Sequence, residues 1–230
     1  MPDEGDRVRE AYARQDRLGL DARYEYWQPD NLFIFQARER AVLDLLNGAR
    51  LLPLTGLRIL DVGCGDGAVL LDLQRYGAEP SLLHGIDLLP GRVESARSRV
   101  PSGALQEGDA RALPFGDAAF DLTLGFTLLS SVVDAGSRRQ VASEMARVTR
   151  PGGVVLLYDF WTNPTNRTVR PLRRSDVRTL FPGQSIEFRR TTLAPPITRA
   201  LFRLPGGRIV ASIFDVIPFL RTHFVAAVHA

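Results

Sequence analysis

The chain has 230 residues, of which 45% are apolar and 24% carry charged side chains. This is ordinary globular composition, sufficient for one domain with a buried core. No segment approaches the roughly 18 consecutive apolar residues of a membrane-spanning helix, so stable membrane insertion is not expected. One cysteine and three histidines exclude a disulfide framework and leave too few ligands for a structural zinc site; no metal is expected. The polar N-terminus is unlike a signal peptide, and we expect a cytoplasmic protein.

The charge is unevenly distributed along the chain. All 29 basic residues other than histidine are arginines. Residues 1–150 hold 18 Arg and 22 acidic residues, a net charge of −4, whereas residues 151–230 hold 11 Arg and 4 acidic residues, a net charge of +7; the sum is the overall +3. A basic C-terminal third favours an anionic ligand or surface. Arginine stems that cover apolar surface would give the same composition.

The first 50 residues are expected to form a helical cap on the main domain. Helices are predicted over 5–18 and 32–49, because apolar residues recur there at helical spacing. The connector between them, 19–31, is rich in aromatic residues and is interrupted by Pro29.

Residues 51–160 alternate short apolar segments with helical stretches. Strands are predicted over 58–62, 82–87, 104–107, 120–126 and 154–159. Helices are predicted over 68–76, 91–99 and 137–149, the last followed by the stop signal Pro151-Gly152-Gly153. This alternation predicts an α/β fold with a doubly wound, mostly parallel sheet. Right-handed crossovers bring the carboxyl ends of its strands to one edge, where ligands bind.

Residues 161–230 are expected to complete the same sheet. A basic helix is predicted over 173–181, and two further strands over 185–193 and 222–229. An apolar insertion, 194–221, interrupted by Pro and Gly and interleaved with arginines, separates these two strands.

The strongest local feature is the sequence ILDVGCGDGAVLLDL at 59–73. A buried strand runs into Gly63, Gly65 and Gly67, and a helix begins at once, so that a ligand can approach the backbone closely. This turn alone also fits a dinucleotide-binding fingerprint, with Asp87 lying 87−63 = 24 residues after the first glycine. An NAD(P)-dependent oxidoreductase is therefore one interpretation of the turn.

Three further features favour a different ligand. Asp61 lies two residues before the first glycine, where a carboxylate would repel a pyrophosphate but attract an ammonium or sulfonium group. Asp109 places a third acid 109−87 = 22 residues after Asp87, at the end of the next strand. The segments LPFGDAAFDLTLGF (113–126) and EMARVTRPGGVVLLYDF (144–160) follow. Together these motifs closely resemble the class I S-adenosylmethionine-dependent methyltransferases, in particular their bacterial small-molecule branch.

The resemblance implies a Rossmann-like sheet of seven strands whose last strand is antiparallel, and S-adenosylmethionine as the cofactor. It implies that the backbone of Gly63, Cys64 and Gly65 meets the methionine moiety, with Asp61 helping to hold its amino group. Asp87 is expected to accept hydrogen bonds from both ribose hydroxyls.

The resemblance assigns further contacts around the cofactor. Leu88 is expected to cover the adenine, Asp109 to accept from its amino group with Ala110 alongside, and Phe126 to offer backbone contacts near the sulfonium. In the N-terminal cap, Tyr24 and Arg38 are expected to close over the cofactor, Arg38 as a partner of its carboxylate. Ordinary packing of the cap on the core is the alternative for these two residues.

One departure from the family concerns a histidine that many relatives carry after the fourth strand. The matching run here is Leu129-Ser130-Ser131-Val132, without histidine. Because the last strand is expected to run antiparallel beside the fifth, His223 at its start should face Asp159 at the end of the other. A histidine oriented by a carboxylate is a plausible general base, with a capping or core histidine as the alternative.

The predicted function is methyl transfer to oxygen or nitrogen of a small sugar-, lipid- or natural-product-derived molecule, amphiphilic or anionic. The insertion 194–221 is expected to roof the acceptor pocket; a homodimer interface, a satellite core and membrane-surface attachment are alternatives. A nucleic-acid substrate is not expected, because Gly125-Phe126-Thr127-Leu128 replaces the motif typical of base methylation. A non-catalytic S-adenosylmethionine-binding subunit is the other interpretation.

Overall fold

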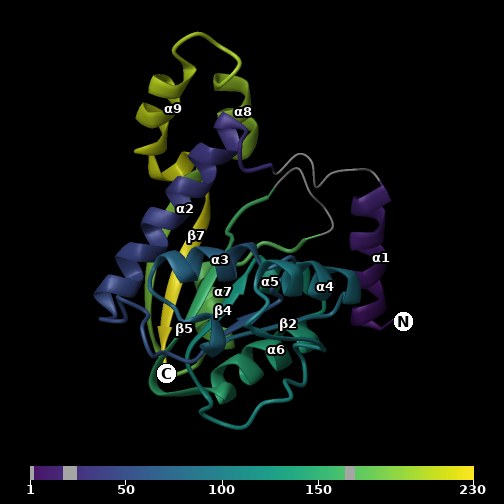
Figure 1. Cartoon of the computed structure of the whole chain (residues 1–230). Helices are drawn as coiled ribbons and strands as arrows, with labels where there is room; N and C mark the ends of the chain where they lie inside the picture. The colour runs from purple at the N-terminus through teal and green to yellow at the C-terminus, as the bar shows by residue number, and fades with distance from the viewer. Residues whose placement is uncertain (1–2, 18–24, 164–168) are drawn as a thin grey trace.

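A seven-stranded sheet forms the centre of the computed structural model, which describes residues 3–17, 25–163 and 169–230 (Figure 1). The strand order is β3-β2-β1-β4-β5-β7-β6. The strands are β1 (Ile59–Val62), β2 (Leu83–Asp87), β3 (Ala104–Glu107), β4 (Phe120–Phe126), β5 (Thr149–Phe160), β6 (Ser185–Leu193) and β7 (Arg221–His229). Only β7 among them runs against its neighbours, pairing antiparallel with both β5 and β6. The predicted fold class is confirmed.

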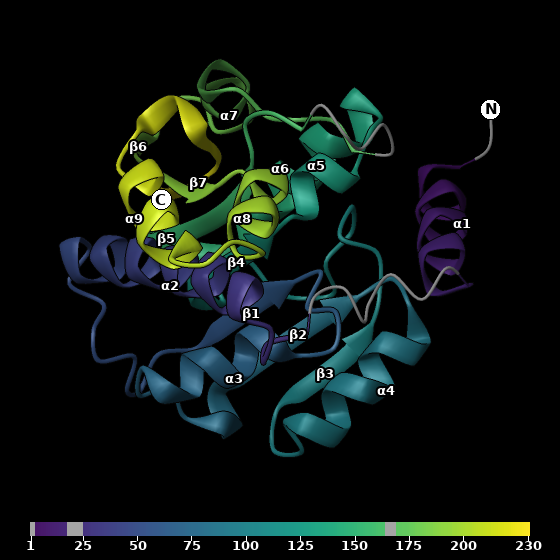
Figure 2. The same ribbon diagram turned by 90° about the horizontal axis from the view of Figure 1, so that it is seen from above.

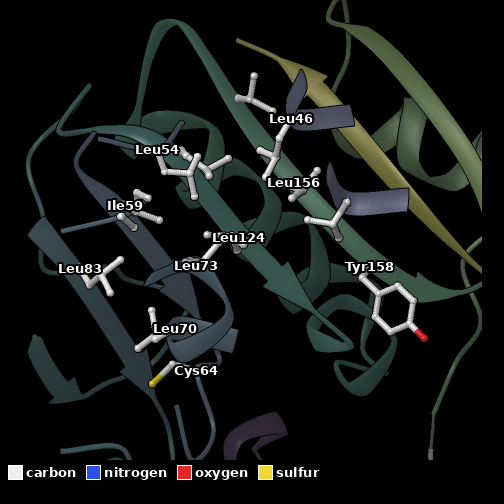
Figure 3. Packing of buried hydrophobic residues seen from close by; sticks show 14 of the residues in the cluster. Leu46, Leu54, Ile59, Cys64, Leu70, Leu73, Leu83, Leu124, Leu156 and Tyr158 are labelled. Atoms are coloured by element: carbon white, nitrogen blue, oxygen red, sulfur yellow. The ribbon is translucent and has the colours of Figure 1, made fainter. Parts of the chain in front are cut away.

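Helices cover both faces of the sheet, so that its inner strands are buried on both sides and read as nearly continuous apolar runs (Figure 2). One face is covered by α2 (Pro29–Gly48), α3 (Ala68–Arg75) and α4 (Pro90–Arg99), the other by α5 (Leu128–Ser131), α6 (Ala135–Val148) and α7 (Arg174–Leu180). The first face packs Leu46 of α2 and Leu73 of α3 over strand residues such as Leu124 and Leu156 (Figure 3). These layers hold the strand ends in fixed positions.

The parallel register aligns the carboxyl ends of the strands at one edge. Val62 of β1 pairs with Ile86 of β2, and Asp87 pairs with Glu107 of β3. Helix α1 (Glu4–Arg17) lies beyond this group of strands, apart from the two helical layers (Figure 2). The predicted order of elements is therefore found from the first helix to the last strand.

Two parts of the chain differ from the sequence-based expectation. Strand β5 begins at Thr149, ahead of the Pro151-Gly152-Gly153 segment, and is longer than predicted. The insertion 194–221 contains two helices, α8 (Pro195–Leu201) and α9 (Gly207–Asp215). The described residues also form two short 3-10 turns, η2 (Pro80–Leu82) and η3 (Pro218–Leu220). Within the described ranges, no helix has the length and apolar character needed to cross a bilayer.

The layered core predicts a clear contrast between two leucines. Leu156 is fully buried in β5, so Leu156→Ala is expected to lower the free energy of unfolding by about 2–5 kcal/mol through lost burial and a cavity. Leu204, between α8 and α9, is largely exposed, and Leu204→Ala is expected to change stability by less than about 0.5 kcal/mol. Urea unfolding of both variants measures this, and equal effects would contradict the described packing.

Candidate cofactor-binding site

The glycine turn after β1 has a backbone that requires glycine. Gly63, Gly65 and Gly67 have φ values of 74°, 53° and 81°, in the left-handed region that L side chains rarely adopt. The amides of Gly63 and Cys64 donate to the Ile86 carbonyl (2.7 and 3.0 Å), which ties the turn to the end of β2. A Cβ on Gly67 would lie 3.2 Å from the Cα of Ala96, so glycine also permits the close approach of α4. The turn thus presents its backbone to a cavity at the carboxyl edge.

Asp61 is a buried carboxylate without a partner. Its side chain is 1% exposed, and neither oxygen accepts a hydrogen bond from any described residue. Burial, and secondarily the nearby negative charge of Asp87, raise the pKa of Asp61 to about 7, although Arg38 opposes the shift. Because Asp61 lines the cavity, its oxygens are available to a ligand that carries donors or positive charge.

Asp87 at the end of β2 is held by the backbone. One oxygen accepts from the Gly65 amide and the other from the Leu89 amide, both at 2.9 Å. Burial raises the pKa of Asp87 despite these bonds. Each oxygen keeps a further lone pair, so the carboxylate can still accept two hydrogen bonds from the cavity side.

Asp109, after β3, is already engaged by Arg111. The guanidinium of Arg111 donates to both Asp109 oxygens (2.6–3.1 Å) and to both Asp3 oxygens (2.7 and 3.0 Å). Partial burial would raise the pKa of Asp109, but the hydrogen bonds from Arg111 lower it. The start of the chain is thereby tied to the cofactor edge, and Glu4 adds a bond from the Val133 amide (2.6 Å).

A cavity of about 250 Å³ unites these groups. Its lining contains most of the predicted cofactor residues: Asp61, Gly63, Gly65, Asp87, Leu88, Asp109, Ala110, Phe126 and Arg38. Cys64 lies behind the turn, where its buried thiol would contact a Cβ placed on Gly85, and burial raises its pKa. Tyr24 falls outside the described residues. Helix α1 contributes Glu4, Gly5, Val8 and Tyr12 to the wall.

Arg38 belongs to the wall, but it has partners of its own. Its guanidinium donates to Asp72 (3.0 Å) and lies 5.8 Å from the ring centres of both Phe126 and Tyr158. The Tyr158 hydroxyl is 3.1 Å from the Thr192 hydroxyl. Tyr158 and Arg111 were not predicted for the site; the position of Tyr158 at the carboxyl end of β5 is a signal that could have indicated it.

The expected contact between His223 and Asp159 is wrong. In the antiparallel register His223 pairs with Phe160, and Asp159 pairs with Phe224, so the two side chains lie on opposite faces of the sheet. The His223 ring stacks on Tyr158 (5.0 Å), and burial lowers its pKa to about 3. Asp159 accepts from the Ser130 amide (3.0 Å) on the other face, and burial raises its pKa to about 6. Neither residue lines the cavity.

The insertion 194–221 also stays away from the cavity. None of the described residues that line it comes from this segment. Part of the wall is supplied instead by α1, through residues such as Val8, and by α5, through Leu128 and Ser131.

Comparison with known proteins identifies the domain that surrounds this cavity. Residues 59–153 match the family model described as "Methyltransferase domain". This part of the chain is a class I S-adenosylmethionine-dependent methyltransferase domain. The resemblance inferred from the sequence is confirmed, and S-adenosylmethionine is the cofactor of this family.

Individual relatives agree with this assignment. The chain is 40% identical over 127 residues to a demethylmenaquinone methyltransferase of Beutenbergia cavernae (54% of this chain, 48% of that protein). It is 31% identical over 173 residues to a ubiquinone biosynthesis O-methyltransferase of Azorhizobium caulinodans (69% of this chain, 62% of that protein). The chain thus spans about half to three fifths of these relatives' length.

A solved structure shares the fold. A TehB-like S-adenosylmethionine-dependent methyltransferase from Corynebacterium glutamicum superposes with a TM-score of 0.59 at 18% identity, covering 96% of each chain. At this identity the likeness concerns the fold alone.

The cavity fits the cofactor of the family. An unpartnered buried carboxylate at Asp61 requires a donor with positive charge, and the cofactor carries an ammonium and a sulfonium group. The glycine turn leaves room for a ligand against the backbone, and Asp87 retains acceptor capacity for hydroxyl groups. The donor set and the cavity therefore agree with S-adenosylmethionine.

Asp61 predicts an unusual dependence of stability on pH. The native state retains a proton on Asp61 between the ordinary pKa of 3.8 and about 7, whereas the unfolded state has released it. The unfolded state then binds fewer protons, so this contribution to stability is lost as the pH rises through that window. Asp61→Asn should lack this loss, and its stability relative to wild type should rise by on the order of 2–4 kcal/mol across the window. Urea unfolding of the ligand-free proteins at several pH values measures the difference; parallel profiles would contradict it.

Proposed function

We propose that this chain transfers a methyl group from S-adenosylmethionine to oxygen or nitrogen of a small metabolite. The observation that carries the proposal is the Asp61 carboxylate, which is buried beside the glycine turn without a partner. Burial disfavours the ionised form of this carboxylate in the free protein, so a ligand that brings positive charge and hydrogen-bond donors to Asp61 is favoured.

Each acidic residue at a strand end would bind a different part of the cofactor. Asp61 would pair with the ammonium end of the cofactor, next to the exposed backbone of Gly63 and Gly65. Asp87 would accept from the ribose hydroxyls while its bonds to the Gly65 and Leu89 amides keep it in place. At the adenine end, Asp109 would act together with Arg111, which already orients its carboxylate.

The chain's own contribution to the reaction is to position the acceptor and to exclude water. When bound, S-adenosylmethionine supplies a methyl group that is already activated by its sulfonium. Apolar side chains of the wall, including Phe126, Leu128 and Val132, line the part of the cavity beside the glycine turn. Holding an acceptor atom in line at about 3–3.5 Å accounts for much of the rate enhancement in such reactions. His223 and Asp159 are not needed for this role, because they lie outside the cavity lining.

The proposed acceptor is a small amphiphilic or anionic molecule. Two of the relatives are named for quinone compounds, ubiquinone and demethylmenaquinone, which agrees with a partly apolar acceptor. The apolar wall and the excess of arginine over acidic residues after residue 150 support the same class.

An NAD(P)-dependent oxidoreductase fits the cavity less well. Asp61 and Asp87 both line it, and the charge of Asp87 already raises the pKa of Asp61. The Asp61 carboxylate, which lines the cavity together with the glycine turn, would repel a pyrophosphate bound there.

Titration calorimetry with S-adenosylhomocysteine tests the proposal. The wild-type chain is expected to bind, and Asp61→Asn to weaken binding by about 10–100-fold, because a hydrogen bond to a charged group is lost. Asp117→Asn is the matched control: Asp117 is exposed at an ion pair with Arg147, outside the cavity lining, and should leave affinity unchanged.

Two results would contradict the proposal. One is saturable NADH binding without S-adenosylhomocysteine binding. The other is tight cofactor binding with no transfer of labelled methyl to any of a broad acceptor panel, which would favour the non-catalytic binding subunit.

A further inference from the structure

Helices α8 and α9 form a hairpin that projects beyond the carboxyl edge of the sheet. Strand β6 ends at Leu193 and α8 begins two residues later, while β7 starts at Arg221, directly after η3. Because β7 alone is antiparallel, both connections lie at the edge where the parallel strands end. Figure 1 shows the hairpin (yellow-green) above the sheet, on the side opposite the C-terminus.

The base of this hairpin is anchored to the domain. Phe202 packs against Phe33 of α2 (ring centres 5.6 Å apart), and Arg199 pairs with Asp30 (3.6 Å). Asp215 accepts from the Leu193 amide (3.2 Å) and pairs with Arg221 (3.4 Å). The hairpin therefore has a defined orientation relative to the carboxyl edge.

Its outer face is apolar and exposed. Ile209, Ile213 and Val216 follow one another at helical spacing and are 58–69% exposed; Phe219 is 72% exposed. The exposed large apolar side chains of the described residues are Leu204, Ile209, Val210, Ile213, Val216 and Phe219 in this hairpin, and Tyr26 and Trp27 just before α2. The first turns of α2 contact α8 through the Phe33 and Asp30 contacts, so all eight lie towards the same end of the molecule. Clustering of this kind marks an interaction surface.

The charges beside this face are positive. Arg203, just after α8, and Arg208, in the first turn of α9, are exposed, and neither pairs with a carboxylate of the described residues. The one acid of the segment, Asp215, is engaged by Arg221. A second copy of the chain, meeting the face through a two-fold contact, would bring like charges together, whereas anionic headgroups would neutralise them.

We propose that the α8–α9 hairpin docks on an anionic membrane surface. Its apolar face would enter the headgroup boundary, as in amphipathic interfacial helices, and Arg203 and Arg208 would contact lipid phosphates. Docking turns the carboxyl edge, with its cavity, towards the bilayer. As a consequence, which rests on the proposed function, the methyl acceptor is an amphiphile held in that bilayer.

Co-sedimentation of the full chain with vesicles tests the docking. Binding is expected to vesicles of phosphatidylcholine mixed with phosphatidylglycerol, and to fall with added salt. Ile213→Asp should lower the partition coefficient at least about tenfold, because a charge replaces an apolar side chain in the boundary. The matched control is Ser98→Asp, an exposed α4 site on the body of the domain, which adds the same charge and should bind like wild type. Thermal unfolding verifies that both variants are folded.

A second variant separates the contribution of the two arginines from that of the apolar face. Replacing Arg203 and Arg208 by Glu should remove the preference for phosphatidylglycerol over pure phosphatidylcholine vesicles. No binding by the wild-type chain, or equal binding by Ile213→Asp, would overturn the docking. A dimer by light scattering that Ile213→Asp dissociates, without vesicle binding, would overturn it in favour of self-association.

The same samples separate this inference from the proposed function. S-Adenosylhomocysteine binding is measured without vesicles, and vesicle binding without cofactor. If the chain binds S-adenosylhomocysteine but not vesicles, only the membrane inference is contradicted. If it binds vesicles but not S-adenosylhomocysteine, only the proposed function is contradicted.

Discussion

The site depends on one carboxylate that the fold buries and does not satisfy. Asp61 directly precedes the glycine turn, but the backbone amides of the turn donate elsewhere: those of Gly63 and Cys64 to Ile86, and that of Gly65 to Asp87. The left-handed glycines make this arrangement possible, because they allow the backbone conformation in which these amides donate to β2. The fold thereby keeps an acceptor for a ligand, and it does so at the expense of stability in the free protein.

The cavity is covered on one side by α1, which is attached mainly by polar contacts. Arg111 joins Asp3 to Asp109, Glu4 accepts from Val133, and Arg92 lies 4.6 Å from the Tyr12 ring. Partly exposed ion pairs of this kind contribute little to stability. The strand ends, in contrast, are held by the hydrophobic layers on both faces of the sheet. The cavity therefore has one wall, on α1, that is attached through polar side-chain contacts, and another, on the sheet, that is backed by the hydrophobic core.

The sequence predicted the sheet well because its signals are local. Alternating apolar runs and the glycine turn specify β1 through β5, and the same runs place Asp61, Asp87 and Asp109 at neighbouring strand ends. The His223–Asp159 pair failed because the side chains of a strand alternate between faces, so an error of one residue in register reverses the outcome. Register depends on how β7 pairs across the sheet, which no local pattern in 222–229 specifies. The ion pairs by which Arg111 joins Asp3 to Asp109 were also missed, because Asp3 lies 108 residues from Arg111 and no local pattern links the two.

The acidic residues of the N-terminal part and the arginines of the C-terminal part lie in different places at the carboxyl edge of the sheet. Acids of the N-terminal part gather inside the carboxyl edge, where burial raises the pKa of Asp61 and Asp87 and favours a cation. Arginines of the C-terminal part reach outward on the hairpin, where Arg203 and Arg208 stay in solvent. The antiparallel β7 joins these features, because its reversed direction makes the β6–β7 connection emerge at the carboxyl edge of the sheet rather than at the far edge. A binding surface on the hairpin and a cofactor in the cavity are thus constrained to act on the same side of the protein.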